Sequence, residues 1–383
     1  MQIFMKIAYV TTYDSSDIKN WSGSGFFIRS SLEQVGFDVH PIGSLSERYK
    51  FQTKMKKGIY KYILGKNYHR EREPQVLRNY ANQVTTALLN VDHDLIFCPG
   101  TTPITYLNTI KPIVVWLDST FACGINFYPY YSNLCNETIR DGNETTQIAL
   151  SKCSLVILSS QWAANKTIEK YEINPDKVKV VPFGANIECN RTIEDINRIV
   201  DEKDFQTCQL IFLGVDWYRK GGDFAVKVAE RLNNRGLRTE LHIVGCNPNE
   251  KLPDFAIRHG FISKSTEVGK KLLDNLFTNS HFLILPSRAE YFGIVFSEAS
   301  SYGLFSLATN VGGIPSAITN GKNGQTFPID ASPEDYCELI ETHFSSREKY
   351  RQLALNSFNE YETRLNWRVS GKKVRELIEA NCV

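Results

Sequence analysis

Two glutamates, Glu290 and Glu298, have the types and the spacing to bind a polar ligand. They lie on either side of a Phe-Gly turn, directly after the apolar run Phe282–Leu285. This order predicts a buried strand, a loop that holds one carboxylate, and a helix whose first turns hold the other. A helix N-terminus presents free N–H groups and a partial positive charge, so it favours anions. Two acids at such a place therefore indicate a ligand that carries both phosphates and hydroxyls, such as a nucleotide sugar.

The two acids also allow a different interpretation, the acid and nucleophile of a glycosidase. The two positions are eight residues apart, and eight residues of helix span about 12 Å. Glycosidase carboxylates lie roughly 5–9.5 Å apart. The spacing therefore favours two separate hydroxyl contacts, one on a sugar and one on a ribose, with a diphosphate at the backbone N–H groups of Phe292, Gly293, Ile294 and Val295. In the alternative interpretation neither glutamate has a function: Glu290 faces solvent, and Glu298 forms a salt bridge.

A basic pair, Arg219 and Lys220, forms a second candidate site. It lies in the stretch Phe212–Gly222, between a predicted strand and a predicted helix. Arginine can hold a phosphate with two parallel hydrogen bonds, and lysine supplies a compact charge. Gly214 and the glycines that follow the pair let the backbone approach a ligand closely. The pair is a candidate diphosphate site, although two exposed cations in a loop would have the same sequence.

The N-terminal half contains two weaker candidates for binding a second substrate. The loop Gly23-Ser24-Gly25 consists of small residues between the first predicted strand and helix. Asp118, followed by Ser119 and Thr120, comes directly after another predicted strand. A carboxylate there could orient or deprotonate a hydroxyl, but capping of the next helix is an equally good interpretation.

Composition excludes several classes of protein. The chain has 383 residues with a formal net charge of +2, so nothing in its overall charge indicates nucleic acid. No apolar run approaches the roughly 18 residues that span a bilayer. The first residues, Met1–Val10, continue without a small-residue cleavage site, so we expect a strand rather than a signal peptide. Nine scattered cysteines without a Cys-x-x-Cys pair indicate reduced thiols and a cytoplasmic protein.

Strands and helices alternate along the chain, which predicts an α/β fold with parallel sheets. The pattern occurs twice, so we expect two Rossmann-like domains facing each other across a cleft. The turn Pro182–Asn186 is the predicted boundary. The expected domains are residues 1–186, residues 187–360 and a C-terminal helix, 361–383, that returns to the first domain. Ligands bind at the carboxyl ends of strands in such sheets, where all the candidate residues are expected.

The segment Arg48–Arg72 is rich in lysine, arginine and tyrosine. One interpretation is a patch that contacts an anionic membrane or an anionic acceptor. The alternative, which we favour from sequence alone, is a solvated insertion in the N-terminal domain.

Taken together, these motifs resemble the retaining glycosyltransferases of family 4, which have the GT-B fold. The resemblance rests on the Glu290-x7-Glu298 spacing, the Gly214–Gly222 loop and Gly312-Gly313-Ile314-Pro315. It covers nearly the whole chain and is strongest from Pro182 to Pro328. Many members have a histidine where this chain has Asp118, so the acceptor side departs from the pattern.

The resemblance implies a role for each matching position. Glu290 would bind the hydroxyls of the donor sugar, Glu298 the donor ribose, and Arg219 and Lys220 the diphosphate. Gly260, Phe261 and Ile262 would read the nucleobase through their backbone. The implied reaction is transfer of a sugar from a nucleoside-diphosphate sugar to a hydroxyl acceptor, with retention, without a cofactor and without a metal. A GT-B epimerase or hydrolase is the alternative enzyme, and a two-lobed solute-binding protein is a more remote one.

Overall fold

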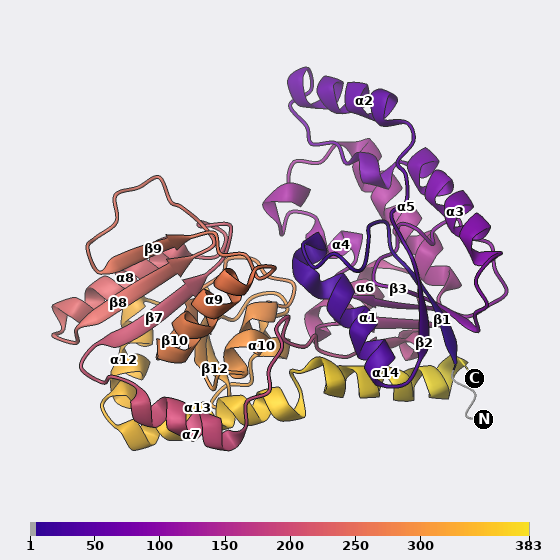
Figure 1. Cartoon of the computed structure of the whole chain (residues 1–383). Helices are drawn as coiled ribbons and strands as arrows, with labels where there is room; N and C mark the ends of the chain where they lie inside the picture. Colours follow the sequence, from indigo (N-terminus) through magenta and orange to yellow (C-terminus); the bar gives the residue numbers. More distant parts are fainter. Residues whose placement is uncertain (1–4, 383) are drawn as a thin grey trace. The chain divides into compact units, whose positions relative to one another are not determined.

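The computed structural model describes residues 5–382, which form two compact α/β units (Figure 1). Unit 1 contains the chain up to Pro182 together with the segment from Ser370 onward. Unit 2 contains Phe183–Val369. Each unit is built around one parallel six-stranded sheet, which confirms the predicted fold class.

The sheet of unit 1 has the strand order β2-β1-β3-β4-β5-β6. Its strands are β1 Lys6–Val10, β2 Asp38–Ile42, β3 Leu95–Cys98, β4 Ile113–Leu117, β5 Leu155–Leu158 and β6 Val178–Val180. The sequence predicts the first strand over Lys6–Thr12, and β1 begins at Lys6 and ends two residues earlier, at Val10. Residues 1–4 of the N-terminal stretch lie outside the described residues. Every residue of β3, β4 and β5 is buried. Continuous apolar runs of this kind are typical of parallel strands with both faces covered.

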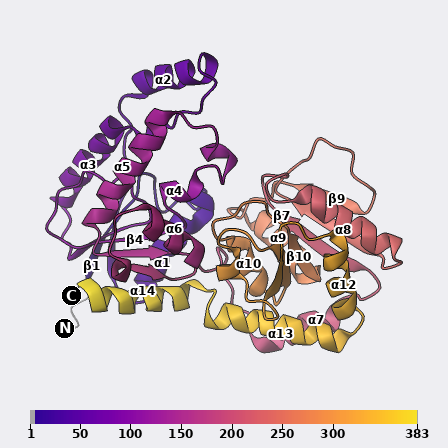
Figure 2. The ribbon, with the colours of Figure 1, turned by 180° about the vertical axis from the view of Figure 1, so that it is seen from behind.

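The helices of unit 1 lie between and around these strands (Figures 1 and 2). They are α1 Ser24–Gln34, α2 Lys50–Tyr62, α3 Pro74–Leu88, α4 Phe121–Gly124, α5 Asn136–Lys152 and α6 Gln161–Lys170. The last helix, α14 Trp367–Cys382, belongs to unit 1 from Ser370 onward. There it lies against the end of α1, where the Arg375 Nη1 donates to the carbonyl of Val35 at 2.6 Å.

The sheet of unit 2 has the strand order β12-β11-β10-β7-β8-β9. Its strands are β7 Cys208–Leu213, β8 Thr239–Val244, β9 Ala256–Gly260, β10 Phe282–Leu285, β11 Phe305–Thr309 and β12 Gly324–Phe327. The helices are α7 Ile193–Glu202, α8 Gly222–Asn234, α9 Glu267–Asn279, α10 Ile294–Ser300, α11 Ile314–Ala317, α12 Pro333–Phe344 and α13 Arg347–Thr363. Helices α7 and α13 lie side by side in Figures 1 and 2 and are joined by hydrogen bonds from Arg351 to Asn197 (3.1 Å) and Asp201 (2.5 Å).

Residues 183–186 belong to unit 2 in the structure, four residues away from the boundary that the turn suggested. Phe183 packs against the rings of Phe292 and Trp367, with ring centroids 5.8 Å and 5.5 Å away. The indole N–H of Trp367 donates to the side-chain oxygen of Asn186 at 3.1 Å. The segment after Pro182 is therefore held by unit 2 through buried aromatic packing, which a Pro/Gly turn in the sequence does not disclose.

Several helices differ from the sequence prediction. The polar stretch after the boundary forms α7, which begins with a reciprocal capping box between Thr192 and Asp195. Such a box satisfies two N–H groups at a helix start, and it explains why a polar segment is helical. The sequence predicts a helix over Glu144–Ser151, whereas α5 begins eight residues earlier, at Asn136. The glycines of Asn320–Gly324 predict a turn, but Gly324 begins β12.

Helix α2 lies within the basic segment and is attached to unit 1 by a cluster of charged and hydrogen-bonded side chains, the α2 clasp. The Lys56 ammonium lies 2.5 Å from the Glu73 carboxylate and 2.7 Å from that of Glu137. The Tyr60 hydroxyl donates to Glu137 at 2.8 Å. Tyr60 also stacks on Tyr68, with centroids 5.4 Å apart. The inward face of this helix is thus held by polar contacts rather than by an apolar core.

We expect Lys56→Met to release α2 while leaving the sheet of unit 1 folded. The substitution keeps the length of the side chain but removes the cation shared by Glu73 and Glu137. Loss of one partner of a partly buried ion pair leaves the other charge uncompensated. Hydrogen exchange should show protection of the α2 amides falling by roughly tenfold or more, with unchanged protection in β3 and β4. Lys57→Met, which removes an exposed lysine of the same helix, is the control and should leave the protection unchanged.

A lower pH should weaken the attachment of α2 to the rest of unit 1. Burial acts to raise the pKa of Glu137, but the hydrogen bonds from Lys56 and Tyr60 outweigh it, so the pKa of Glu137 lies below its usual value. A carboxyl whose folded pKa is lowered contributes stability above its unfolded pKa, about 4.3 for glutamate. That contribution is lost as the pH falls through the lowered value. Protection of the α2 amides, corrected for intrinsic exchange, should therefore decrease below about pH 4; a flat profile would show that the clasp does not hold the helix.

Candidate functional site

The main candidate site lies where the strand order of unit 2 reverses, between β7 and β10. The chain runs from β7 to β8 and β9 on one side of this point, and β10 leads to β11 and β12 on the other. Crevices for ligands form at such switch points, outside the carboxyl ends of the strands. The loop of residues 214–221 follows β7, and the loop of residues 286–293 follows β10, so both predicted motifs meet here.

Three charged side chains converge in these two loops. The Lys220 ammonium forms a hydrogen-bonded ion pair with the Glu290 carboxylate. The Arg219 guanidinium lies 3.7 Å from the same carboxylate and donates to the carbonyl of Ala289 at 2.9 Å. Glu290 is 7% exposed, so the alternative of a solvent-facing glutamate is wrong. We call Arg219, Lys220 and Glu290 the charged triad.

The backbone around the charged triad is fixed by contacts between three loops. The backbone N–H of Arg288 donates to the carbonyl of Arg219 at 2.7 Å. From the loop after β11, the N–H of Gly313 donates to the carbonyl of Glu290 at 3.0 Å. Asp216 orients Arg219, because it accepts from the Arg219 backbone N–H at 3.0 Å and from its Nε at 3.3 Å. Contacts between the loops after β7, β10 and β11 therefore fix the positions of the three residues of the charged triad.

Two glycines are required for this geometry. A side chain at Gly214 would place its Cβ 2.8 Å from the Cγ of Lys220. Gly221 has φ of +77° and lies against the backbone of Pro286. Only glycine adopts such a φ without cost and allows this approach. The small residues of the predicted diphosphate loop thus let Lys220 lie across the backbone toward Glu290.

Glu298 is buried in α10, where it is 1% exposed and forms a hydrogen-bonded ion pair with Lys264. Lys264 comes from the loop after β9, so this pair joins two neighbouring regions of unit 2. Glu298 is therefore salt-bridged, as the alternative interpretation without function predicts, and the two glutamates pair with different cations. No local sequence pattern indicates the pair of Lys264 and Glu298, since 34 residues separate the two positions.

The other predicted donor-side residues lie at the same edge of the sheet. Gly260 ends β9, and Phe261 after it is exposed. Gly293 precedes α10 with φ of +86°. Phe292 and Val295 are buried. Ile294 is the first residue of α10, which has seven residues.

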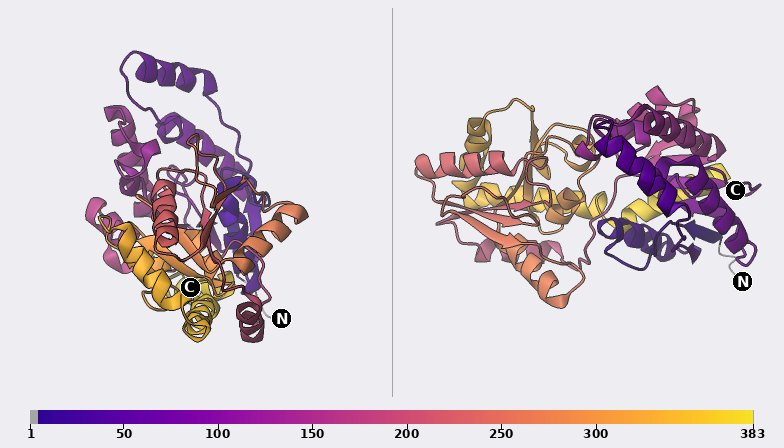
Figure 3. Two further views of the ribbon diagram at one scale, coloured as in Figure 1. Left: turned by 90° about the vertical axis from the view of Figure 1, so that its left-hand side faces the viewer. Right: turned by 90° about the horizontal axis from the view of Figure 1, so that it is seen from above.

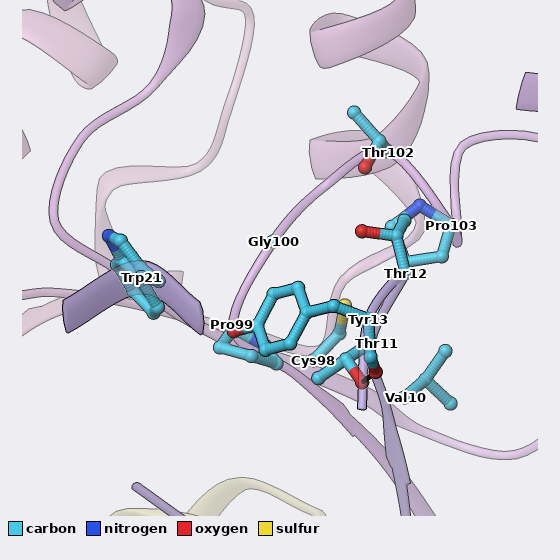
Figure 4. A pocket seen from close by; sticks show the side chains of 10 residues that line it. All are labelled: Val10, Thr11, Thr12, Tyr13, Trp21, Cys98, Pro99, Gly100, Thr102 and Pro103. Carbon is cyan, nitrogen blue, oxygen red and sulfur yellow. Dashed lines mark hydrogen bonds between the residues drawn. The ribbon is translucent and has the colours of Figure 1, made fainter. Parts of the chain in front are cut away.

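Unit 1 has a pocket at its own switch point, between β1 and β3. The pocket has a volume of about 140 Å³ and is lined by residues that follow these two strands, among them Thr11, Tyr13, Trp21, Cys98 and Gly100. Figure 4 shows the Tyr13 ring in the middle of this group, with Trp21 on one side and Thr102 and Pro103 on the other. Sequence reasoning did not single out Tyr13 or Trp21, although both follow a strand within the loop that it examined.

Tyr13 connects the pocket to the predicted acceptor-side residues. Burial raises the pKa of its hydroxyl, and the neighbouring Cys98 and Asp118 raise it further. Gly25 packs against the ring, where an added Cβ would lie 2.8 Å from the Tyr13 Cε2. The structure therefore brings Gly25 to the Tyr13 side chain.

The remaining acceptor-side residues differ in their surroundings. Gly23 has φ of +89° and precedes Ser24, the buried first residue of α1. Ser119 donates to the Asp118 carboxylate at 3.1 Å. Thr120 is the N-cap residue of α4 and lies two positions after Asp118. Thr120 itself is buried against Thr167 and Cys123, which is a packing environment.

Comparison with known proteins identifies a family for most of unit 2. Residues 194–360 match the family model described as glycosyl transferases group 1. Across 98% of this chain and 100% of the other, the structure resembles HepE of Anabaena in complex with UDP and glucose, with a TM-score of 0.65 and 16% identity. The likeness to HepE shows the fold alone. The segment that matches the family model includes every member of the charged triad. The chain has the fold of the GT-B glycosyltransferases, and its residues 194–360 belong to the group 1 family.

Curated relatives of this GT-B glycosyltransferase align over only part of their length. The gpi3 subunit of phosphatidylinositol N-acetylglucosaminyltransferase from Schizosaccharomyces pombe is 25% identical over 180 residues, which are 46% of this chain and 38% of that protein. The D-inositol 3-phosphate glycosyltransferase of Paenarthrobacter aurescens is 24% identical over 230 residues, 56% of this chain and 55% of that protein. The aligned segments thus span less than two thirds of these relatives.

Within residues 5–382, one group of acids has the spacing of metal ligands, and it lies in unit 1. Glu73, Glu137 and Asp141 bring carboxylate oxygens within 4.8 Å of one another, but the Lys56 ammonium already lies against two of them.

Within residues 5–382, the structure contains no helix with the length and apolar character needed to cross a membrane.

Proposed function

We propose that this GT-B glycosyltransferase belongs to family 4 and transfers a sugar from a nucleoside-diphosphate sugar to an acceptor hydroxyl, with retention at the anomeric carbon. The charged triad at the β7/β10 switch point is the observation that carries this proposal. It combines two cations suited to a diphosphate with a buried carboxylate suited to sugar hydroxyls. That HepE was solved with UDP and glucose supports the same class of donor.

The donor would exchange partners with the charged triad. In the structure Lys220 and Arg219 compensate the buried charge of Glu290. A diphosphate brings its own negative charge to the cations, and the sugar hydroxyls bring hydrogen-bond donors to Glu290. Each buried charge therefore keeps a partner when the donor enters, which limits the cost of desolvation.

The cations would then act on the step in which the glycosidic bond to the diphosphate breaks. Negative charge develops on the leaving phosphate as the anomeric carbon becomes oxocarbenium-like. Fixed positive groups at that position lower the energy of the transition state more than that of the bound donor. We assign this role to Lys220 and Arg219. Glu298 would bind the ribose, with Lys264 holding its carboxylate in place until the donor arrives.

The acceptor would bind in the pocket of unit 1. Asp118, beside Tyr13, would orient the attacking hydroxyl, whose proton passes to the departing phosphate. The Tyr13 and Trp21 rings would supply apolar faces to a sugar or another cyclic acceptor.

A product assay tests the proposal against the alternative of an epimerase or hydrolase. The protein is incubated with UDP-, GDP- and ADP-sugars, with and without a mixture of hydroxyl acceptors. Transfer predicts an acceptor-dependent glycoside with the anomeric configuration of the donor. Free sugar or an epimerised nucleotide sugar, formed at the same rate without acceptor, would favour the alternative enzyme.

Removal of divalent metal should leave the activity unchanged. The cationic part of the charged triad comes from the protein itself, and it supplies the charge that a bound cation supplies in metal-dependent transferases. Initial rates measured in excess EDTA should equal those measured with Mg²⁺ or Mn²⁺. A strict requirement for a metal would contradict the role given to Arg219 and Lys220.

A further inference from the structure

Helix α2 presents its apolar side chains outward. Thr53, Lys56 and Tyr60 share the inward face, where they make the contacts of the α2 clasp or lie buried. Phe51, Met55 and Ile59 repeat at every fourth residue, so they share another face. They are exposed by 76%, 55% and 48%. A surface helix in a globular protein normally does the reverse and buries its apolar stripe.

The exposed apolar surface continues beyond the end of the helix. Tyr62, Ile63 and Leu64 are exposed as well. Figures 1 and 2 and the left view of Figure 3 all show α2 standing out from the rest of unit 1. We define these six residues, Phe51, Met55, Ile59, Tyr62, Ile63 and Leu64, as the apolar ridge. Contiguous exposed apolar side chains of this kind mark an interaction surface.

A row of lysines runs along the same helix beside the apolar ridge. Lys50, Lys54, Lys57 and Lys61 are all exposed, and their spacing places them on a third face, distinct from the ridge and from the clasp. No acidic residue occurs between Arg48 and Arg70. The surface that α2 offers is therefore both apolar and strongly positive.

We propose that α2 docks this protein onto an anionic lipid bilayer, with the apolar ridge inserted among the headgroups and the lysine row on the lipid phosphates. An apolar face flanked by lysines, with aromatic residues at its ends, is the pattern of a helix that lies in a membrane interface. Binding of a protein partner needs matched acidic groups, whereas an anionic bilayer neutralises every lysine of the row at once. This inference concerns a surface outside the donor site and does not depend on the proposed reaction.

Because of the α2 clasp, the face of α2 that carries the apolar ridge is the one that can meet the bilayer. Lys56 and Tyr60 use polar contacts to fix the inward side of the helix, so the apolar ridge cannot turn inward to be buried. The helix is folded and oriented before it meets a surface, which reduces the entropy lost on binding.

Vesicle co-sedimentation of the full chain tests the proposal. Two compositions are compared, phosphatidylcholine alone and phosphatidylcholine with phosphatidylglycerol at a ratio of roughly three to one. We expect the protein to pellet with the anionic vesicles and to bind the neutral ones much more weakly. Binding should weaken as salt is raised, because exposed charges are screened.

Two variants separate the two parts of the surface. Phe51→Ser/Met55→Ser/Ile59→Ser should lower the partition coefficient by roughly tenfold or more, since it removes the apolar groups that would leave water. Lys54→Gln/Lys57→Gln/Lys61→Gln should lower binding to anionic vesicles by roughly fivefold per lysine and reduce the salt dependence. Leu89→Ser/Ile110→Ser, at two positions outside α2 that are more exposed than the three residues of the helix, is the control and should bind like the wild type.

All variants change exposed side chains, so their thermal unfolding midpoints should match that of the wild type. Equal pelleting of the wild type and the Phe51→Ser/Met55→Ser/Ile59→Ser variant would overturn the proposal. So would absence of binding to anionic vesicles combined with a self-association, measured by light scattering, that the same substitutions abolish, since the ridge would then be a contact between protein chains.

Discussion

Replacement of Lys220 by alanine is expected to lower turnover by roughly 100- to 1000-fold, the usual cost of removing one electrostatic contact to a developing negative charge. Lys220 is held against Glu290 at the β7/β10 switch point, and its charge would meet the leaving diphosphate. Arg219 remains in the variant, so residual activity is expected. Initial rates at saturating donor, together with a thermal unfolding scan, measure the effect.

Lys227→Ala is the control for this variant. Lys227 is an exposed lysine of α8, the helix that begins directly after the loop carrying Lys220. Its loss should change neither the rate nor the unfolding midpoint. A Lys220→Ala protein with wild-type turnover would contradict the proposal that Arg219 and Lys220 bind the diphosphate.

Glu290→Gln is expected to have the second large effect. The substitution keeps the shape of the side chain and removes its charge, so the sugar hydroxyls lose a charged acceptor and Lys220 loses its main partner. Charge-assisted hydrogen bonds are about twice as strong as neutral ones, and we expect kcat to fall by roughly 100-fold. Glu298→Gln, which alters the acid assigned to the ribose, should raise KM more than it lowers kcat.

The same pair should show energetic coupling in the absence of donor. Lys220→Met and Glu290→Gln each leave a buried group without its charged partner, whereas the double variant removes both charges. The loss of unfolding free energy in the double variant should therefore be smaller than the sum of the single losses, by about 0.5–3 kcal/mol. Strict additivity would mean that the two side chains do not depend on each other.

Much of this architecture follows from the sequence because the strands are buried on both faces. The apolar runs Leu95–Cys98 and Ile113–Leu117 predict strands with the bounds that β3 and β4 have. The charged residues in the loops after β7 and β10 could be placed at the sheet edge from the order of elements alone. Parallel strands require this placement, so Arg219, Lys220 and Glu290 were predictable as neighbours.

Contacts between distant segments could not be predicted in the same way. Nothing local links Lys264 with Glu298, or Phe183 with Trp367, since each pair meets only when separate loops pack together. The orientation of α2 also depends on contacts between distant segments. Its apolar stripe is visible in the sequence, but only the contacts of Lys56 with Glu73 and Glu137 show that the stripe faces outward.

Binding of nucleoside diphosphates tests the central claim, that the charged triad forms a diphosphate-sugar site, most directly. Unfolding midpoints are measured with UDP, GDP and ADP for the wild type and for Lys220→Ala. A ligand at about 100 times its Kd stabilises the folded state by about 2.7 kcal/mol, which corresponds to roughly 5–10 °C for a unit of this size. We predict such a rise with at least one nucleotide in the wild type and its loss in Lys220→Ala. No rise with any of the three, or an equal rise in the variant, would contradict the account.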